Sequence, residues 1–194
     1  TGGIRIVNNF SSKNGVNSKL ITCHTPVITT RLLWAQVAAA ISKYKLMCPN
    51  SKVLFSVCDV KSAYYCLSIC RSDREVTAFI CNTKQVQYQR LSMGLSCAPS
   101  LFLQYMNIAF GDLTSDRWHL FRYMDDLIVC APEEYMGEAI SALFDKVKSA
   151  HMTISLDKSM FFQEQVEYLG FHLSSSGCSS SKDKLKVLLE YPIP

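Results

Sequence analysis

Three aspartates, Asp59, Asp125 and Asp126, have the types and positions in this 194-residue chain that best suit a chemical reaction. Asp59 ends the strand-forming run VLFSVCDV. Asp125 and Asp126 are adjacent in FRYMDDLIVC, between two further strand-forming runs. A carboxylate at a strand end and a carboxylate pair on a neighbouring hairpin can converge on one point. Carboxylates brought together in this way repel one another unless a cation neutralises them.

An all-oxygen site of this kind suits Mg²⁺ or Mn²⁺ better than zinc. Two such ions, about 3.5–4 Å apart, form the arrangement that is used for in-line phosphoryl transfer. A purely structural interpretation stays open at this point. Aspartate is a common turn residue, and two adjacent aspartates in a turn are weak evidence when taken alone.

Hydrophobic patterning predicts the elements that must position these acids. We expect helices from Thr30 to about Met47, over APSLFLQYMNIAF, over Glu133–Ala150 and over Lys182–Leu189. We expect strands over VLFSVCDV, WHLFRYM, LIVCA, MTISL and VEYLGFHL, a hairpin of EVTAFIC and QVQYQR, and a surface turn over SSSGCSSS. These elements predict an α+β fold, an antiparallel sheet with helices packed on one face.

The composition, 48% apolar and 19% charged, is that of a folded protein. Net charge is only +4, but residues 1–58 carry seven Lys and Arg and no acid. This excess favours an anionic partner such as nucleic acid or a triphosphate. Alternatively, the balancing acids lie in a preceding part, because the chain begins with Thr1 and reads as a piece of something longer.

The nine cysteines include no C-x-x-C pair, and most lie in apolar runs. We therefore expect reduced thiols, an intracellular setting in a reducing compartment and no structural metal. The longest apolar stretch, Leu32–Ile41, is too short to span a bilayer, so no membrane partner is expected.

Five blocks occur in order along the chain: DVKSAYYCL (59–67), RLSMGLSCAPSLF (90–102), YMDDLIV (123–129), ISLDKSMFF (154–162) and VEYLGFHLSSSG (166–177). Together they resemble the reverse transcriptases of retroviruses and, more closely, of gypsy-type LTR retrotransposons. The resemblance covers nearly the whole chain. It implies the palm of a right-hand polymerase with partial fingers: fingers over 1–52, palm over 53–173 with a fingers-like insertion near 72–92, and 174–194 leading toward a missing thumb.

The resemblance also implies roles for the acids. Asp59 and Asp125 match the family's metal-binding aspartates, and Asp126 matches a second acid that supports the site more than it binds metal. The implied site holds two Mg²⁺ or Mn²⁺ ions between Asp59, Asp125, Asp126 and the backbone of Val60. Lys158 is a possible general acid for the leaving pyrophosphate, and a solvated surface lysine is the alternative.

Other matched positions imply contacts with the incoming nucleotide and with the template-primer. The implied dNTP contacts are Arg5, Lys61, Ser62, Ala63, Tyr64, Met93 and Gly94. Backbone N–H groups of residues 60–63 would approach the triphosphate. Tyr64 matches a steric gate that excludes ribose; the alternative is a core tyrosine at a strand-to-helix bend. The implied template-primer contacts are Tyr123, Met124, Leu169, Gly170 and Phe171, and for Phe171 ordinary β-sheet packing is the alternative.

The function so implied is an RNA-directed DNA polymerase, which transfers a nucleotide from dNTP to a primer 3′-hydroxyl on an RNA or DNA template. The expected partners are template-primer, dNTPs and the remainder of a Pol polyprotein with thumb and RNase H, and the piece alone should be weakly processive. One alternative is an RNA-dependent RNA polymerase, against which Tyr64 argues. Another is a domesticated retroelement palm that only binds nucleic acid.

Overall fold

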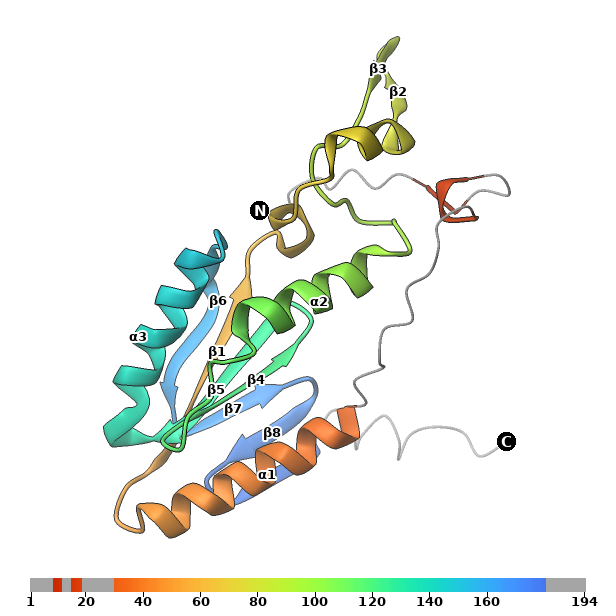
Figure 1. Cartoon of the computed structure of the whole chain (residues 1–194). Coiled ribbons are helices and arrows are strands. Elements are labelled where there is room, and N and C mark those ends of the chain that lie inside the picture. Colours follow the sequence, from red (N-terminus) through yellow and green to blue (C-terminus); the bar gives the residue numbers. More distant parts are fainter. Residues whose placement is uncertain (1–8, 12–14, 19–29, 181–194) are drawn as a thin grey trace, which may run out of the picture. The chain divides into compact units, whose positions relative to one another are not determined.

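The computed structural model of the chain describes residues 9–11, 15–18 and 30–180 (Figure 1). Contacts within the chain divide it into two compact units. Unit 1 comprises residues 1–26 and 62–110, and unit 2 comprises residues 27–61 and 111–194. Arg5 and the helix predicted over Lys182–Leu189 lie outside the described residues. The division into fingers and palm stays a prediction.

Unit 2 is built on a four-stranded antiparallel sheet in the order β4-β5-β1-β6. The strands are β1 (Val53–Val60), β4 (His119–Tyr123), β5 (Asp126–Pro132) and β6 (Ile154–Gln163). β1 lies inside the sheet and is buried along almost its whole length. Its nearly continuous apolar run is the pattern of a strand that is covered on both faces, so the strands predicted around the three aspartates are confirmed.

Helix α1 (Thr30–Met47) covers one face of this sheet. Its predicted apolar side is confirmed, because Leu33, Val37, Ala40, Ile41 and Tyr44 are all buried. These side chains share a core cluster with alternate residues of the sheet, among them Phe55, Val57, Ile128 and Cys130.

Helix α3 (Glu133–Ser149) packs against the opposite face. Ser56 lies between Phe55 and Val57 in β1, and its hydroxyl donates to the Met136 sulfur at 3.4 Å. Since successive strand residues point to opposite faces, α1 and α3 divide between the two sides of the sheet. The α+β class with an antiparallel sheet is confirmed, and the structure adds a helix on the second face, which a strand as apolar as β1 requires.

A second sheet of unit 2 consists of β7 (Gln165–Tyr168), β8 (Phe171–Ser174) and β9 (Gly177–Ser180). Its buried residues Val166, Tyr168 and Leu173 belong to the core cluster beneath α1. The prediction of a single strand over VEYLGFHL is wrong: the chain turns at Leu169 and Gly170, which have φ of 48° and 72°, and the run forms two paired strands. β9 forms where only a surface turn was predicted, because its polar residues pair with β8 through the backbone.

β6 is longer than the predicted strand MTISL and runs on to Gln163 at the edge of the sheet. Its pairing with β1 is interrupted by two register shifts. The Phe162 N–H donates to the Ser56 hydroxyl oxygen at 3.0 Å, which ties the irregular end of β6 to the centre of the sheet. Ser56 is fully buried, whereas Phe162 is 51% exposed, so this bond joins the core to the surface of the sheet.

Unit 1 contains helix α2 (Ala98–Phe110), the hairpin of β2 (Phe79–Cys81) and β3 (Lys84–Val86), and short 3-10 helices at Val16–Ser18, Ala63–Cys66 and Arg71–Thr77. The helix over APSLFLQYMNIAF is confirmed. The hairpin is shorter than predicted, because residues 75–77 complete a 3-10 helix in place of a strand. The core of this unit is formed by Phe10, Leu91, Leu95 and Ala98.

No helix in the described ranges is both long and apolar enough to cross a membrane.

Candidate active site

Asp59 and Asp126 face each other across neighbouring strands of unit 2. In the register of β1 and β5 these two residues are direct partners. Residues opposite each other in an antiparallel pair project from the same face, with Cβ atoms about 4.5–5.5 Å apart. The two carboxylates thus continue the face that carries Phe55 and Val57, the face beneath β7 and β8.

Asp125 lies in the turn next to this pair. Tyr123 pairs with Asp126, which leaves Met124 and Asp125 as the connection between β4 and β5. The Val60 N–H donates to the Asp125 carbonyl oxygen at 2.9 Å, so the turn is bonded to the end of β1. The Asp125 side chain is exposed. All three aspartates are therefore brought to one end of the two inner strands, β1 and β5, with Asp126 directly across from Asp59.

Met124, in the turn between β4 and β5, has a strained backbone conformation. Its φ is 54°, in the left-handed region that non-glycine residues rarely occupy. Positive φ at the first position of a two-residue hairpin loop favours glycine. A methionine in this conformation costs free energy. The paired strands on either side of the turn can keep its backbone in that conformation.

The electrostatics of the site reflect crowded negative charge. Burial raises the pKa of the Asp126 carboxyl from 3.8 to about 6, and the charges of Asp125 and then Asp59 add to the shift. The Lys158 ammonium on β6 opposes it and lies 3.5 Å from Asp59 Oδ2. The Lys158 side chain is 59% exposed and the Asp59 side chain is 17% exposed. A largely exposed lysine therefore partly balances the charge of a carboxylate that is mostly buried.

Two of the N–H groups expected to approach a triphosphate are already used inside unit 2. The Val60 N–H bonds to Asp125, and the Lys61 N–H donates to the Thr153 carbonyl oxygen at 2.8 Å. In unit 1 the chain continues through Ser62, whose φ is 55°, into the short helix that begins at buried Ala63. Backbone contacts with a phosphate would therefore have to come from Ser62 onward.

Tyr64 and Gly94 lie in unit 1. Tyr64 is half-buried; it packs against the unit 1 core and edge-on against Phe102, with ring centroids 5.5 Å apart. Gly94 is exposed, with a φ of 95° that side-chain-bearing residues rarely adopt. Met93, beside it, is half-buried. The predicted roles of these residues in nucleotide binding stay predictions.

Asn17 is a residue of this segment that sequence reasoning missed. Its side-chain amide donates to the Gly94 carbonyl oxygen at 2.9 Å, and its side-chain oxygen accepts from the Ser96 N–H at 2.8 Å. Asn17 therefore bonds to the backbone on both sides of Leu95, at Gly94 and at Ser96. No local pattern could have revealed it, because it is 77 residues from Gly94 in the chain.

Tyr168 was also missed, and it links the predicted primer-binding hairpin to the acid-bearing strand. Its buried hydroxyl donates to the Asp126 carbonyl oxygen at 3.3 Å. Trp34 of α1 packs against Phe171, with ring centroids 4.3 Å apart, and edge-on against Tyr168 at 6.0 Å. Phe171 thus has a packing role within unit 2, as its structural interpretation anticipated, and Leu169 and Gly170 form the tip of the hairpin.

The donor set is of the kind that Mg²⁺ uses. In the described ranges, no group of three or more His, Cys, Asp and Glu side chains is arranged to hold a metal ion. Mg²⁺ sites in phosphoryl-transfer enzymes, however, typically use one or two protein carboxylates and complete the shell with substrate phosphates and water. Asp59 and Asp126 on one face, with Asp125 beside them, fit that requirement.

The predicted site residues divide between the two units. Unit 2 holds the three aspartates together with Val60, Lys61, Tyr123, Met124, Lys158 and the hairpin tip at Leu169, Gly170 and Phe171. Unit 1 holds Ser62, Ala63, Tyr64, Met93 and Gly94. Within unit 2, the register of β1 with β5 and the Lys158–Asp59 contact bring the acids and the lysine together.

Comparisons with known proteins identify the family to which the chain is similar. The family described as Reverse transcriptase (RNA-dependent DNA polymerase) matches residues 6–173. The chain is 32% identical over 145 residues to the retrovirus-related Pol polyprotein from transposon gypsy of Drosophila melanogaster, an overlap of 72% of this chain and 13% of that protein. It is 28% identical over 146 residues to the transposon Tf2-3 polyprotein of Schizosaccharomyces pombe, which covers 75% of this chain and 11% of that protein.

Solved structures share the fold. The foamy viral protease-reverse transcriptase dRH in complex with double-stranded DNA superimposes with a TM-score of 0.78 at 17% identity, over 98% of this chain and 30% of that one. A prototype foamy virus protease-reverse transcriptase mutant gives 0.67 at 21% identity, over 86% of this chain and 20% of that one. The chain spans only about an eighth of the length of the curated relatives described above.

Proposed function

Because the chain belongs to the reverse transcriptase (RNA-dependent DNA polymerase) family, we propose that it carries the nucleotidyl-transfer site of a retroelement Pol protein. It adds a nucleotide from dNTP to the 3′-hydroxyl of a primer on an RNA or DNA template. The observation that carries this proposal is the direct pairing of Asp59 with Asp126, beside Asp125 in a turn bonded to β1.

In the proposed reaction, Asp59 and Asp125 would hold two Mg²⁺ or Mn²⁺ ions, and Asp126 would maintain the negative potential around them. The ions, when bound, would lower the pKa of the primer hydroxyl and neutralise the departing pyrophosphate. Lys158 is the candidate proton donor to the pyrophosphate, supported by its position 3.5 Å from Asp59. Leu169 and Gly170, at the hairpin tip, and Tyr123 and Met124, at the turn, support the primer end.

Removing the carboxylates one at a time tests the proposal. We expect Asp59→Asn and Asp125→Asn to lower primer extension with Mg²⁺ and dNTPs by at least about 100-fold, because each variant loses an anionic metal ligand. Asp126→Asn should have a smaller effect. Exposed Asp157→Asn on β6 is the matched control and should extend primers normally. Circular dichroism verifies the fold, and undiminished extension by Asp125→Asn contradicts the metal assignment.

The choice of sugar tests the role of Tyr64. If its ring excludes the ribose 2′-hydroxyl, Tyr64→Ala should incorporate rNTPs markedly better relative to dNTPs. Tyr65→Ala, the neighbouring half-buried tyrosine, is the matched control. Preferential use of rNTPs by the unaltered chain would instead indicate an RNA-dependent RNA polymerase.

We further propose that the chain works within a longer Pol polyprotein and in a reducing, intracellular setting. The first point is supported by relatives that are themselves Pol polyproteins and far longer than this chain. The second is supported by the thiols: none of the eight cysteines in the described residues is in a disulfide.

A further inference from the structure

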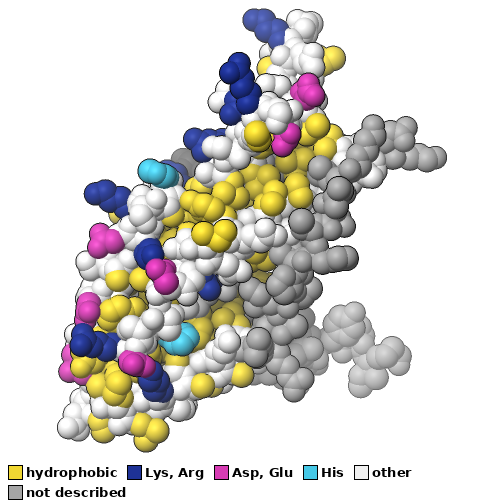
Figure 2. Space-filling model, in the orientation of Figure 1, with side chains coloured by type: hydrophobic (Ala, Val, Ile, Leu, Met, Phe, Trp, Pro, Cys, Tyr) yellow, Lys and Arg dark blue, Asp and Glu magenta, His cyan; other side chains and the backbone are white. Residues whose placement is uncertain are grey.

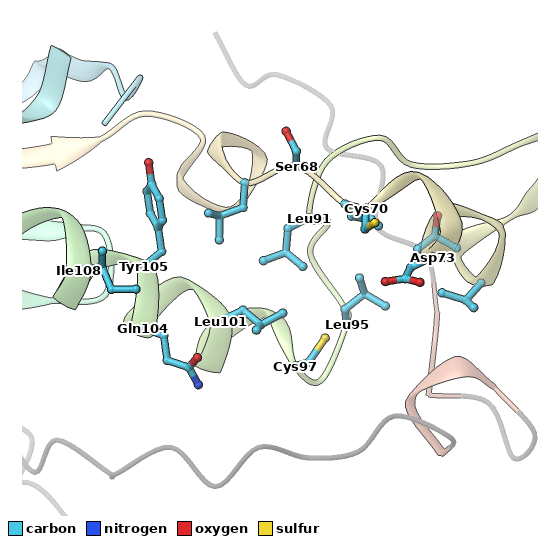
Figure 3. Close-up of a pocket in the computed structure, with 14 residues that line it drawn as sticks. Ser68, Cys70, Asp73, Leu91, Leu95, Cys97, Leu101, Gln104, Tyr105 and Ile108 are labelled. Atoms are coloured by element: carbon cyan, nitrogen blue, oxygen red, sulfur yellow. The ribbon is translucent and has the colours of Figure 1, made fainter. Parts of the chain in front are cut away.

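Unit 1 contains a cavity of about 500 Å³ that takes no part in the proposed polymerase site. It lies between the segment 67–77 and helix α2 (Figure 3). Figure 3 shows Leu91, Leu95 and Leu101 directed toward a common space, and the Cys97 thiol directed toward them. None of the residues predicted to contact metal, nucleotide or template-primer lines it. Its volume is within the range of small-molecule sites, roughly 300–1,000 Å³.

The lining is mainly apolar, and part of it remains open to solvent. Buried Leu91 and Leu95 form the interior, whereas Leu101 is 40% exposed and Ile108 83% exposed. Figure 2 shows apolar side chains gathered over α2 and the adjoining chain of this unit. Large apolar side chains that remain exposed around a concave surface are typical of a binding site.

The charge of the lining restricts the occupant. Asp73 is the one charged residue among the described residues of the lining, and it is exposed. Arg74 and Arg90 are not part of the lining; they donate to two lining residues, to the Ile69 carbonyl oxygen at 3.1 Å and to the Ser68 hydroxyl oxygen at 3.0 Å. A phosphate or carboxylate group in the cavity would meet a like charge at the edge and no cation of the lining itself. The charge of the lining therefore disfavours nucleotides, and an uncharged or positively charged apolar molecule fits both the lining and its charge.

We propose that this cavity binds a neutral or cationic apolar small molecule, at a site separate from the polymerase acids. Such a ligand would contact Leu91 and Leu95, which flank Met93 and Gly94 in sequence. Both leucines also belong to the core cluster against which Tyr64 packs. The binding itself does not depend on the proposed polymerase activity and can be tested without it.

The chain offers a matched pair of thiols for that test. Cys70 lines the cavity and is exposed, and its sulfur accepts a hydrogen bond from the Ser72 hydroxyl at 3.3 Å. This bond lowers the pKa of the Cys70 thiol and favours its reactive thiolate. Cys81, in β2 of the same unit, is also exposed and lies outside the lining. The rate at which Cys81 is modified therefore measures the reactivity of an exposed thiol that does not line the cavity.

The experiment compares N-cyclohexylmaleimide with N-(2-hydroxyethyl)maleimide on the whole chain. In each reaction the thiolate adds to the carbon–carbon double bond, a sulfur–carbon bond forms, and the neighbouring carbon takes a proton from water. Peptide mass spectrometry gives the rate at each cysteine. We expect the ratio of cyclohexyl to hydroxyethyl rates to be about tenfold higher at Cys70 than at Cys81, the effect of burying about two methylene groups.

Two variants locate the preference. Leu101→Gln should reduce the Cys70 ratio to that of Cys81, because it places an amide in the aliphatic wall. Ile80→Gln changes a side chain that is 79% exposed and outside the lining, and should leave the ratio unchanged. If Leu101→Gln fails to fold, Ile108→Gln serves the same purpose. Equal ratios at Cys70 and Cys81, or a ratio that survives the lining variants, would overturn the proposal.

A reversible probe tests the charge preference. Cyclohexylmethylammonium should slow the modification of Cys70 more than cyclohexanecarboxylate does, with no difference at Cys81. Asp73→Asn should abolish the preference for the cation while leaving the protection by the apolar ring. Stronger protection by the carboxylate would contradict the assigned ligand class.

Discussion

The aspartates at the end of β1 and at the β4–β5 turn are held in an environment that penalises their charge. Asp126 is half-buried, faces Asp59 across the strand pair and adjoins Asp125. Lys158, which partly balances them, is itself mostly exposed. Uncompensated negative charge lowers the stability of the folded chain but attracts a cation. Removal of one of these charges should therefore raise the free energy of unfolding and weaken metal binding.

The stability of the metal-free chain should depend on the protonation of Asp126. Its folded pKa of about 6 exceeds the ordinary 3.8, so the folded state binds the proton more tightly between about pH 4 and 6. The free energy of unfolding should therefore fall as pH rises through that window and level off above it. In EDTA, Asp126→Asn should remove this slope and stabilise the chain at pH 7 by about 1–2 kcal/mol, after allowance for solvent screening. Urea denaturation at several pH values measures both effects.

Asp157→Asn on β6 is the control for that experiment, because this exposed acid is not among the causes of the shift at Asp126. It should retain the slope of the unaltered chain. An identical slope in Asp126→Asn would show that another group is responsible.

Lys158 should compete with a metal ion for Asp59. Replacing it with methionine removes an ammonium 3.5 Å from the Asp59 carboxylate, so we expect Lys158→Met to bind Mn²⁺ about 2- to 5-fold more tightly. That factor corresponds to the small energy of a solvent-exposed ion pair. Electron paramagnetic resonance of free Mn²⁺ measures the affinity without any need for catalysis. Lys148→Met, an exposed lysine on α3, should leave it unchanged, and weaker binding by Lys158→Met would refute the competition.

At the scale of elements, the central strand β1 organises unit 2 through both of its faces. One face packs against α1 and the second sheet; the other contacts α3 at Met136. Ser56 is a fully buried polar residue in the middle of β1, and its hydroxyl donates to the Met136 sulfur and accepts from the Phe162 N–H. The position of β6, and with it of Lys158, therefore depends in part on one buried hydroxyl.

Removing that hydroxyl should destabilise the chain. Ser56→Ala leaves the Phe162 N–H without its partner, and we expect a loss of about 1–3 kcal/mol in the free energy of unfolding. Chemical denaturation measures it. Ser42→Ala on the exposed side of α1 is the control and should stay within about 0.5 kcal/mol of the unaltered chain. A Ser56→Ala stability equal to that of the control would show that water replaces the lost acceptor.

Local patterns predicted the elements well wherever one periodicity was strong. In α3, Met136, Ala139, Ile140, Leu143 and Val147 are buried as predicted, and only Phe144 of the predicted apolar side is exposed. Patterns failed where backbone pairing decides the structure. β9 (Gly177–Ser180) consists of four small residues with no strand signal, and it forms because its backbone pairs with β8. The long extension of β6 likewise depends on its pairing with β1.

The candidate site divides in the same way. The convergence of the acids could be expected from their positions at the ends of strand-forming runs. Their roles as metal ligands came from the resemblance to reverse transcriptases and stay predictions. Asn17 and Tyr168 could not be predicted, since their hydrogen bonds join residues 77 and 42 positions apart. The direct opposition of Asp59 to Asp126 also depends on strand register, which a single sequence does not reveal.

At the scale of the whole molecule, charge is distributed unevenly. The first 58 residues carry seven basic residues and no acids, whereas the whole chain has a net charge of +4. A partner with a phosphate backbone would be attracted to that part of the sequence, and its binding would release condensed counterions.

Binding of a primer-template duplex should therefore weaken strongly with salt. If about four of the basic residues contact phosphates, the affinity should fall roughly 100-fold between 50 and 200 mM salt. Fluorescence anisotropy measures the slope. Lys19→Gln, within the basic stretch, should reduce the slope by about one if Lys19 contacts a phosphate, and Lys148→Gln, outside it, should not. Affinity independent of salt would contradict an electrostatic role for this stretch.

The register of β1 with β5 also has a consequence for how the gene can vary. Seven successive pairs run from Val53 with Pro132 to Asp59 with Asp126. Loss or gain of a single codon within either strand would turn every following side chain to the other face and carry one aspartate away from its partner. Such a change could leave a chain that still looks apolar and strand-like but has lost its acid pair. Small insertions and deletions should therefore be tolerated in segments such as 49–52 and strongly disfavoured between the start of β1 and Asp59.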